Sequence, residues 1–216
     1  MKFIALLFTI LSSCCAVKQH AYTATSTAEY EYINTVRLMV ACTHGAHVGT
    51  GVIMSYKYVL TAKHVATCGE GQEPPLVIMA FDLNRKQFPM KINLHSPTQD
   101  VTRLEIKGDA KFKTYARFNF EGNQPIGEPV CTVGGDDVTF MVRKCGEITP
   151  SSESYFYSTI PIVPGNSGSG LWDATGAVIG INVRGRWNPV GEKITLTVPI
   201  TLVMDLFTDI YPTQHL

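Results

Sequence analysis

Ser167 lies in a turn whose sequence favours nucleophilic chemistry. Residues 158–170 read STIPIVPGNSGSG, so an apolar, β-branched segment leads into a glycine-rich turn that contains this serine. Such a turn exposes a hydroxyl group and directs neighbouring backbone N–H groups to one point. A serine attacks a carbonyl group efficiently only when a base removes its proton and fixed donors stabilise the oxyanion. The motif therefore predicts a histidine and an acid elsewhere in the chain.

A histidine and an aspartate occur upstream, each next to a predicted strand. Residues 58–65 read YVLTAKHV, a β-branched and aromatic run that delivers His64 at its end. Residues 100–106 read DVTRLEI, a short apolar strand with Asp100 at its start. The chain order is therefore His64, Asp100 and Ser167.

Other residues of the same types are weaker candidates. His44 and His47 are alternative bases, but they precede the strand pair that leads to His64. Asp82 and Asp109 are alternative acids, although neither begins an alternating apolar strand. Taken singly, a serine in a glycine-rich turn or an aspartate at a strand end is more often structural.

The elements that must position these residues are many short strands separated by Gly, Pro and Asn turns, a pattern typical of all-β barrels. We expect strands at 33–41, 48–54, 58–62, 76–82, 88–94, 101–106, 128–134, 138–147, 155–161, 169–173, 177–183 and 193–198. The apolar spacing over 200–211 instead predicts a short amphipathic α-helix.

Composition fits one compact domain. The chain has 216 residues, of which 45% are hydrophobic, with 18 glycines and 12 prolines, enough to bury a substantial core. Its 18 basic and 18 acidic side chains give a formal net charge of zero. No basic stripe is present, so we expect no nucleic-acid partner.

Three ordered motifs carry a family resemblance. Thr-Ala-x-His, Asp-Val-x-x-Leu and Gly-Asn-Ser-Gly-Ser-Gly, in this order, resemble the trypsin-like serine proteases of bacterial or viral type. Residues 177–185 resemble the strand that lines their substrate cleft, and the likeness covers roughly residues 30–212. The resemblance implies two six-stranded antiparallel β-barrels, roughly 30–115 and 116–216, with a short C-terminal α-helix and a polypeptide substrate between the barrels.

The resemblance also implies a role for each residue. His64 is then the general base and Asp100 orients its ring. The oxyanion hole is formed by backbone N–H groups of the segment Gly165, Asn166 and Ser167, with Asn166 held between the two donors. No metal or organic cofactor is implied. The implied cleft residues are Pro161, Ile181, Asn182, Val183, Arg184 and Gly185.

Departures from the animal trypsin pattern are informative. Asn166 stands where those enzymes have an aspartate that binds the freed N-terminal ammonium, so we expect no such proteolytic trigger. Val183 stands where many relatives offer a serine hydroxyl to the catalytic aspartate, which leaves backbone N–H groups or Thr61 as donors to Asp100. Pro161 replaces the aspartate of tryptic specificity, which argues against a preference for Lys or Arg.

The two arginines that follow the cleft strand can be interpreted in two ways. Arg184 and Arg186 either attract acidic substrate groups or are solvated on a turn.

The N-terminal segment has the features of an export signal. Lys2 is followed by the apolar residues 3–11 and then by Ser-Ser-Cys, a run too short to span a bilayer. Residues 11–14 resemble a bacterial lipoprotein box, which implies a signal peptide over 1–14 with lipid on Cys14. Residues 15–29 are then a flexible tether before the domain at 30–216. The alternative is plain secretion with cleavage after Ala16.

The four remaining cysteines fit two disulfides and an oxidising compartment. Four cysteines allow three pairings. The resemblance favours Cys42 with Cys68, and Cys131 and Cys145 flank two predicted strands that they could bridge. A zinc site is disfavoured because the paired spacing of zinc ligands is absent.

The main hypothesis is an exported serine endopeptidase, tethered by lipid to a membrane facing the periplasm or the cell exterior, or secreted. One alternative is a lipoprotein that uses the protease fold as a binding module. Another is a small-ester hydrolase, although Gly-x-Ser-x-Gly hydrolases have the order Ser, acid, His.

Overall fold

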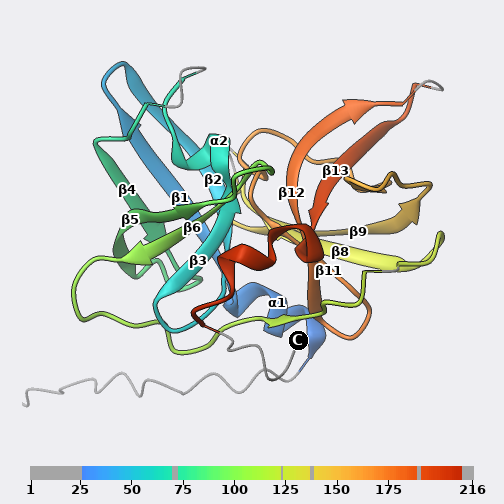
Figure 1. The fold of residues 1–216 in the computed structure, drawn as a ribbon, viewed down its shortest axis with the longest axis horizontal. Helices are drawn as coiled ribbons and strands as arrows, with labels where there is room; N and C mark the ends of the chain where they lie inside the picture. Colours follow the sequence, from blue (N-terminus) through green and yellow to red (C-terminus); the bar gives the residue numbers. More distant parts are fainter. Residues whose placement is uncertain (1–25, 70–72, 123, 137–138, 189–190, 211–216) are drawn as a thin grey trace, which may run out of the picture.

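Two β-barrels lie side by side in the computed structural model (Figure 1). The structure describes residues 26–69, 73–122, 124–136, 139–188 and 191–210. The first barrel closes in the order β1-β2-β3-β6-β5-β4 with antiparallel pairs. Its strands are β1 (Thr35–Cys42), β2 (Gly45–Ile53), β3 (Tyr58–Ala62), β4 (Val77–Phe81), β5 (Gln87–His95) and β6 (Val101–Ile106).

The second barrel is formed by β8 to β13 in the order β11-β8-β9-β10-β13-β12, and the pairing of β11 with β12 closes it. The short strand β7 (Arg117–Phe118) adds in parallel to β12. The barrel strands are β8 (Pro129–Gly134), β9 (Val142–Thr149), β10 (Phe156–Ser158), β11 (Gly170–Trp172), β12 (Ala177–Trp187) and β13 (Lys193–Pro199). The predicted all-β fold of two six-stranded antiparallel barrels is confirmed.

The C-terminal helix differs in type from the prediction. It is a 3₁₀ helix, η1 (Ile200–Leu206), rather than an α-helix over 200–211. The three buried residues Ile200, Val203 and Leu206 are three apart, which suits the three residues per turn of a 3₁₀ helix. Arg103 of β6 donates to Leu206 O at 2.7 Å and pairs with Asp209, so this end of the chain is bound to the first barrel as well as the second.

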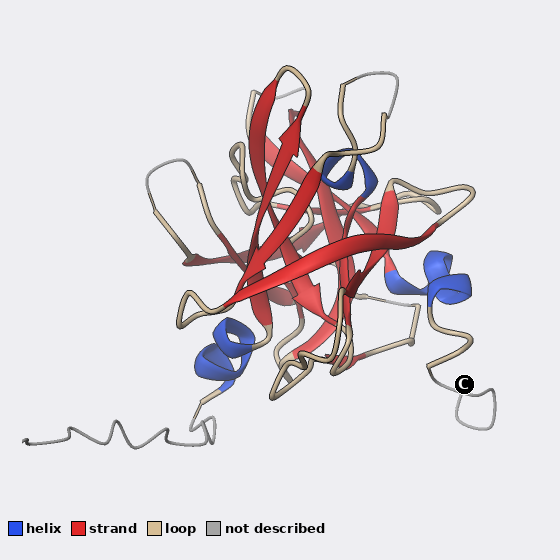
Figure 2. Ribbon diagram, turned by 90° about the vertical axis from the view of Figure 1, so that its left-hand side faces the viewer, coloured by secondary structure: helices blue, strands red, loops and turns tan. Residues whose placement is uncertain are grey.

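A helix begins before the expected domain boundary. Helix α1 (Thr27–Ile33) is capped by Ser26, whose hydroxyl accepts a hydrogen bond from Glu29 N at 3.2 Å. Residues 27–29 are therefore helical, although the sequence placed them in a tether. The remaining residues of the tether before Ser26, and the signal and lipid site, lie outside the described residues. Figure 2 shows the helices at the periphery of the strands.

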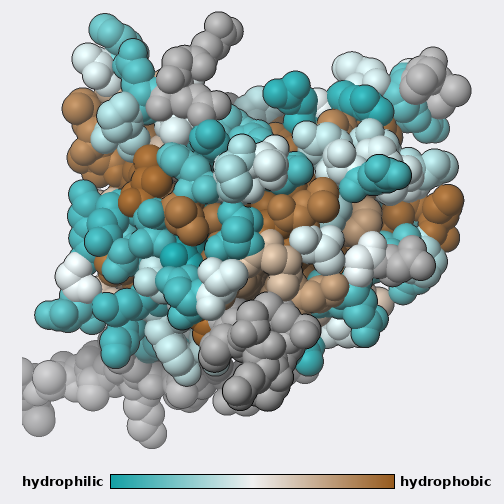
Figure 3. All heavy atoms as spheres, in the orientation of Figure 1, coloured by the Kyte–Doolittle hydropathy of each residue, from teal (hydrophilic) through white to brown (hydrophobic). Residues whose placement is uncertain are grey.

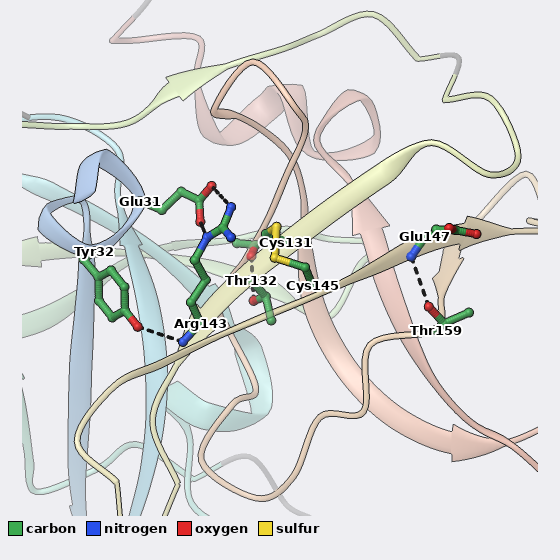
Figure 4. The surroundings of a disulfide bond; sticks show 9 residues. Glu31, Tyr32, Cys131, Thr132, Arg143, Cys145, Glu147 and Thr159 are labelled. Atoms are coloured by element: carbon green, nitrogen blue, oxygen red, sulfur yellow. Dashed lines mark hydrogen bonds and ion pairs between the residues drawn. A yellow bond between two sulfur atoms is a disulfide. The ribbon is translucent and has the colours of Figure 1, made fainter. Parts of the chain in front are cut away.

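An ion pair between the buried Glu31 and the partly exposed Arg143 attaches α1 to the second barrel (Figure 4). Glu31 is fully buried and accepts two hydrogen bonds from Arg143 of β9, at 2.6 Å to Nε and 3.0 Å to Nη2. These hydrogen bonds raise the pKa of Arg143. Tyr32 Oη also accepts a hydrogen bond from Arg143 N at 2.9 Å. The start of the domain is thus fixed beside β9.

Both disulfides form in the expected pairs. Cys42 and Cys68 connect β1 to the segment after the short helix α2 (Lys63–Ala66). Cys131 and Cys145 are directly opposite each other on β8 and β9 (Figure 4). The first bond restrains the segment that follows His64, and the second restrains the strand pair that carries Arg143.

One apolar core joins the two barrels. Its buried residues include Leu38 and Leu60 of the first barrel together with Trp172, Val198 and Phe207 of the C-terminal half. A smaller cluster fills the second barrel and comprises Val130, Ile148, Phe156, Ile160, Ile162, Leu171 and Ile179. The face seen in Figure 1 mixes hydrophilic with hydrophobic residues (Figure 3). Among the described residues, no helix has the length and apolar character needed to cross a membrane.

The Glu31–Arg143 pair gives a prediction about stability. Arg143→Met leaves a fully buried carboxylate without its cation, so we expect the free energy of unfolding to fall by about 3 kcal/mol. Glu31→Gln keeps an acceptor for Arg143 and should cost less, about 1 kcal/mol. Urea unfolding at pH 7 measures both. Equal losses in the two variants would contradict this account.

Candidate active site

His64 and Asp100 meet at the edge of the first barrel. His64 lies in α2, directly after β3, and Asp100 directly precedes β6, which pairs with β3. His64 Nδ1 lies 2.7 Å from Asp100 Oδ2, and the backbone N of His64 donates to Asp100 Oδ1 at 3.0 Å. One carboxylate therefore binds both the ring and the backbone of the histidine.

The sequence left two kinds of donor open for Asp100. The structure uses the backbone N–H of His64. Thr61, the other candidate, donates its hydroxyl to Thr50 O at 2.7 Å and is fully buried. The Thr61 alternative is therefore wrong, because that hydroxyl is used between two strands of the first barrel.

Ser167 lies on a tight turn of the second barrel. The N–H of Asn166 donates to Val163 O at 3.0 Å, which closes a turn through Pro164 and Gly165. Gly165 has φ of +91°, a left-handed conformation that glycine adopts readily. A Cβ atom at this position would lie 2.8 Å from Gly135 O. Glycine at 165 is therefore required by both the backbone angle and the available space.

Two backbone donors of this turn are available to a ligand. Within the described residues, the N–H groups of Gly165 and Ser167 donate no hydrogen bond to the protein. Both residues line the same cleft. The Asn166 N–H between them is used inside the turn, so the geometry suits the predicted arrangement of two donors with Asn166 held between them.

Thr50 of β2 holds the turn from the opposite barrel. Its N–H donates to Ser167 O at 2.9 Å, and its hydroxyl donates to Gly165 O at 2.7 Å. The same hydroxyl accepts a hydrogen bond from Gly135 N at 3.3 Å. Thr50 is fully buried, so these contacts form away from water. They fix the position of Ser167 relative to the barrel that carries His64.

The side chain of Asn166 holds the turn from within the second barrel. Its Nδ2 donates to Gly135 O at 2.6 Å, and its Oδ1 accepts from Val163 N at 3.2 Å. Lys144 Nζ lies 3.4 Å from the same oxygen and 3.3 Å from Pro161 O. Because Asn166 is almost completely buried, its polar atoms need hydrogen-bond partners, and these contacts supply them. Sequence reasoning missed Lys144, since it lies outside the motifs.

A cleft between the barrels is lined by two of the three predicted catalytic residues, and Asp100 lies outside its lining. His64 and Ser167 line it, with Val65 on one side and Ile162, Val163 and Pro164 on the other. Among the described residues, the Ser167 hydroxyl makes no hydrogen bond with His64. Such bonds are often long in free enzymes and tighten when substrate binds.

The predicted cleft residues divide into three groups. Val183, Arg184 and Gly185 line the cleft. Ile181 and Asn182 are fully buried beneath it, where Asn182 Nδ2 donates to Ser169 Oγ and Thr132 Oγ1 at 3.0 Å each. Pro161 is exposed but does not line the cleft.

The alternative candidates lie in other environments. His47 borders the cleft, but its Nε2 lies 2.9 Å from Val65 O and its Nδ1 lies 3.9 Å from Cys42 Sγ, with no carboxylate partner among the described residues. His44 lies at the exposed turn between β1 and β2. Asp82 Oδ1 caps the turn between β4 and β5, and Asp109 is exposed in a loop. No group of three potential metal ligands occurs in the described part of the chain.

Comparison with known proteins agrees with the fold. Residues 49–181 match the model of the trypsin-like peptidase domain. A protein of Pseudomonas fluorescens named "Probable periplasmic serine endoprotease DegP-like" is 29% identical over 168 residues, which cover 73% of this chain and 34% of that protein. A protein of the same name from Pseudomonas fulva is 27% identical, covering 73% of this chain and 33% of its own length.

Solved structures show the same fold. An HtrA-type protease, the S227A variant of AlgW with a tripeptide, superposes with a TM-score of 0.73 at 19% identity, covering 87% of this chain and 63% of that one. The serine endoprotease from Yersinia pestis gives a TM-score of 0.71 at 21% identity, covering 87% and 67%.

The chain belongs to the family of trypsin-like peptidase domains. It spans about a third of the length of the curated relatives that it matches.

The Thr50 contacts give a prediction. Thr50→Val removes the hydroxyl that joins Gly165 O and Gly135 N, which leaves both buried groups without this partner. We expect the free energy of unfolding to fall by about 2 kcal/mol and the rate of reaction of Ser167 with a fluorophosphonate to fall as well. Thr50→Ser keeps the hydroxyl and is the control. Wild-type stability and reaction rate in Thr50→Val would contradict the role of Thr50.

Proposed function

We propose that this chain is a serine endopeptidase that hydrolyses polypeptides through an acyl-enzyme intermediate, with His64, Asp100 and Ser167 as its catalytic triad. The observation that carries the proposal is the 2.7 Å contact between His64 Nδ1 and Asp100 Oδ2 beside a cleft that Ser167 also lines. Membership of the trypsin-like peptidase family supports the same reaction.

Acylation follows from the chemistry of these groups. With the Nδ1–H of His64 donated to Asp100, the Nε2 atom is left as the base that accepts the proton of Ser167. The Ser167 oxygen attacks the substrate carbonyl, and the oxyanion is stabilised by the N–H groups of Gly165 and Ser167. His64 then gives the proton to the leaving amine, the C–N bond breaks, and the acyl group remains on Ser167.

Deacylation repeats the sequence with water. His64 accepts a proton from water, the hydroxide oxygen attacks the acyl carbonyl, and the proton returns to the Ser167 oxygen as the carboxylic product leaves. Asp100 stabilises the imidazolium ring formed in each step. No step requires a metal or an organic cofactor.

In this proposal, the turn that carries Ser167 does not need an N-terminus released by proteolysis. The neutral Asn166 cannot form an ion pair with an N-terminal ammonium, and its side chain is bound by Gly135 O, Val163 N and Lys144 Nζ. The domain is therefore active without proteolytic activation.

Export and a lipid anchor complete the proposal. The sequence of residues 1–14 supports an export signal with lipid on Cys14, and the curated relatives are named as periplasmic proteins. Two disulfides suit an oxidising compartment. The catalytic domain then lies at the outer face of a membrane and cleaves polypeptides there.

Labelling with a fluorophosphonate tests the enzymatic part. The full-length protein should be labelled, and Ser167→Ala should lose label and peptide cleavage completely, because the nucleophilic oxygen is gone. Ser154→Ala, at an exposed serine between β9 and β10, is the control and should behave as wild type. A folded wild-type protein without label at Ser167 would favour a binding module instead. Label combined with cleavage of small esters but of no peptide would favour the esterase.

Metabolic labelling with a fatty acid tests the anchor. In bacteria that express the full chain, the protein should carry the label and fractionate with membranes. Cys14→Ser should lose both properties, whereas the neighbouring Cys15→Ser should keep them. A mature protein that begins at Val17, without lipid, would refute the anchor and leave plain secretion.

A further inference from the structure

Two cationic side chains border the cleft next to Ser167. Arg184 comes from β12 and Lys193 from β13, two paired strands that lie side by side (Figure 1), and both residues line the cleft. Among the described residues that line this cleft, none is an aspartate or a glutamate. The carboxylate of Asp100 is already bound by His64. The side of the cleft formed by β12 and β13 therefore carries a positive charge.

Neither cation has an acidic partner in the described part of the chain. The ion pairs found there join His64 with Asp100, Lys91 with Glu105, Arg103 with Asp209 and Arg143 with Glu31. Arg186 differs from Arg184, because its guanidinium lies over the ring of Tyr157, 4.8 Å from the ring centroid, and it does not line the cleft. Of the two arginines noted in the sequence, only Arg184 is thus available to a substrate in the cleft.

Lys193 lies beside apolar side chains of the cleft. A Cβ atom on Gly185 would lie 3.3 Å from both Cγ1 and O of Ile162 and 3.8 Å from Lys193 Cε. Ile162 and Val183 are both buried and line the same cleft. This part of the cleft is therefore formed by apolar side chains, by the backbone of Gly185 and by the end of Lys193. A charge beside apolar walls is screened less by water than one on an open surface.

The direction of a bound peptide follows from the free edge of β12. At Gly180 and Ile181 this strand pairs with β11 on one side and β13 on the other, and beyond Asn182 it pairs with β13 alone within the described residues. A substrate strand can add to this open edge. The residue before the scissile bond has its carbonyl carbon at Ser167, and Gly185 and Lys193 line the same cleft, so its side chain can reach Lys193.

We infer that the cleft selects peptides with an acidic residue immediately before the scissile bond, and that Lys193 is the specificity-determining residue that binds this carboxylate. Arg184 lines the same cleft and adds to its positive charge. This inference rests on the proposed peptidase function. Of the two arginines that could attract acidic substrate groups, it assigns this role to Arg184 and not to Arg186.

The test uses fluorogenic peptides of one sequence that differ only in the residue before the scissile bond, which is Glu, Gln, Leu or Lys. For the wild-type full chain, kcat/KM should be about tenfold higher with Glu than with Gln, the effect expected of a partly desolvated ion pair. This ratio should fall as salt increases, because ions screen the attraction.

Variants assign the effect to one residue. Lys193→Met should bring the Glu to Gln ratio close to one, and Lys193→Glu should favour the Lys peptide. Arg186→Met is the matched control and should keep the wild-type ratio. Equal kcat/KM for Glu and Gln in wild type, or an unchanged ratio in Lys193→Met, would overturn the inference.

Fluorophosphonate labelling of the same preparations separates the two proposals. Label at Ser167 with cleavage of all peptides at similar rates refutes the acidic preference and leaves the peptidase intact. Absence of both label and cleavage from folded protein refutes the peptidase itself, and the inference with it.

Discussion

Thr50 binds the turn of Ser167 through both its backbone and its hydroxyl, and the rest of the site depends on these hydrogen bonds. His64 and Asp100 belong to the first barrel, whereas Ser167 belongs to the second. A catalytic group displaced by about 1 Å can lose a hundredfold in rate, so the barrels must keep one relative position. The Thr50 contacts supply this fixed point, and the apolar core shared by the barrels surrounds it.

The turn also needs support from its own barrel. Asn166 binds Gly135 O, and Lys144 lies beside its carbonyl oxygen. Strand β9, which carries Lys144, also carries Arg143, the partner of the buried Glu31. The N-terminal helix and the nucleophile turn are thus attached to the same strand. Where animal trypsins have an aspartate, this turn has a neutral amide whose side chain contacts Gly135 O, Val163 N and Lys144 Nζ.

Much of the fold and of the candidate site could be predicted from the sequence, because alternating strands and three motifs are local patterns. The expected strands are present, and His64 meets Asp100 as the motifs implied. The contacts that the sequence did not reveal join distant segments, as Thr50 does with Gly165 and Glu31 does with Arg143. The one local feature that marks Thr50 in the sequence is its position between Gly49 and Gly51. The structure shows why these are glycines, because their Cβ atoms would clash with Val65 and Val59. We predicted an α-helix instead of a 3₁₀ helix because apolar residues three positions apart form one stripe along either type of helix.

A crystal structure of the full chain after reaction with a peptidyl phosphonate tests the central claim most directly. The account predicts phosphorus bonded to Ser167 Oγ, a phosphonyl oxygen bound by the N–H groups of Gly165 and Ser167, and Thr50 still bonded to the turn. Reaction at another residue, or an oxygen that faces away from both N–H groups, would contradict it.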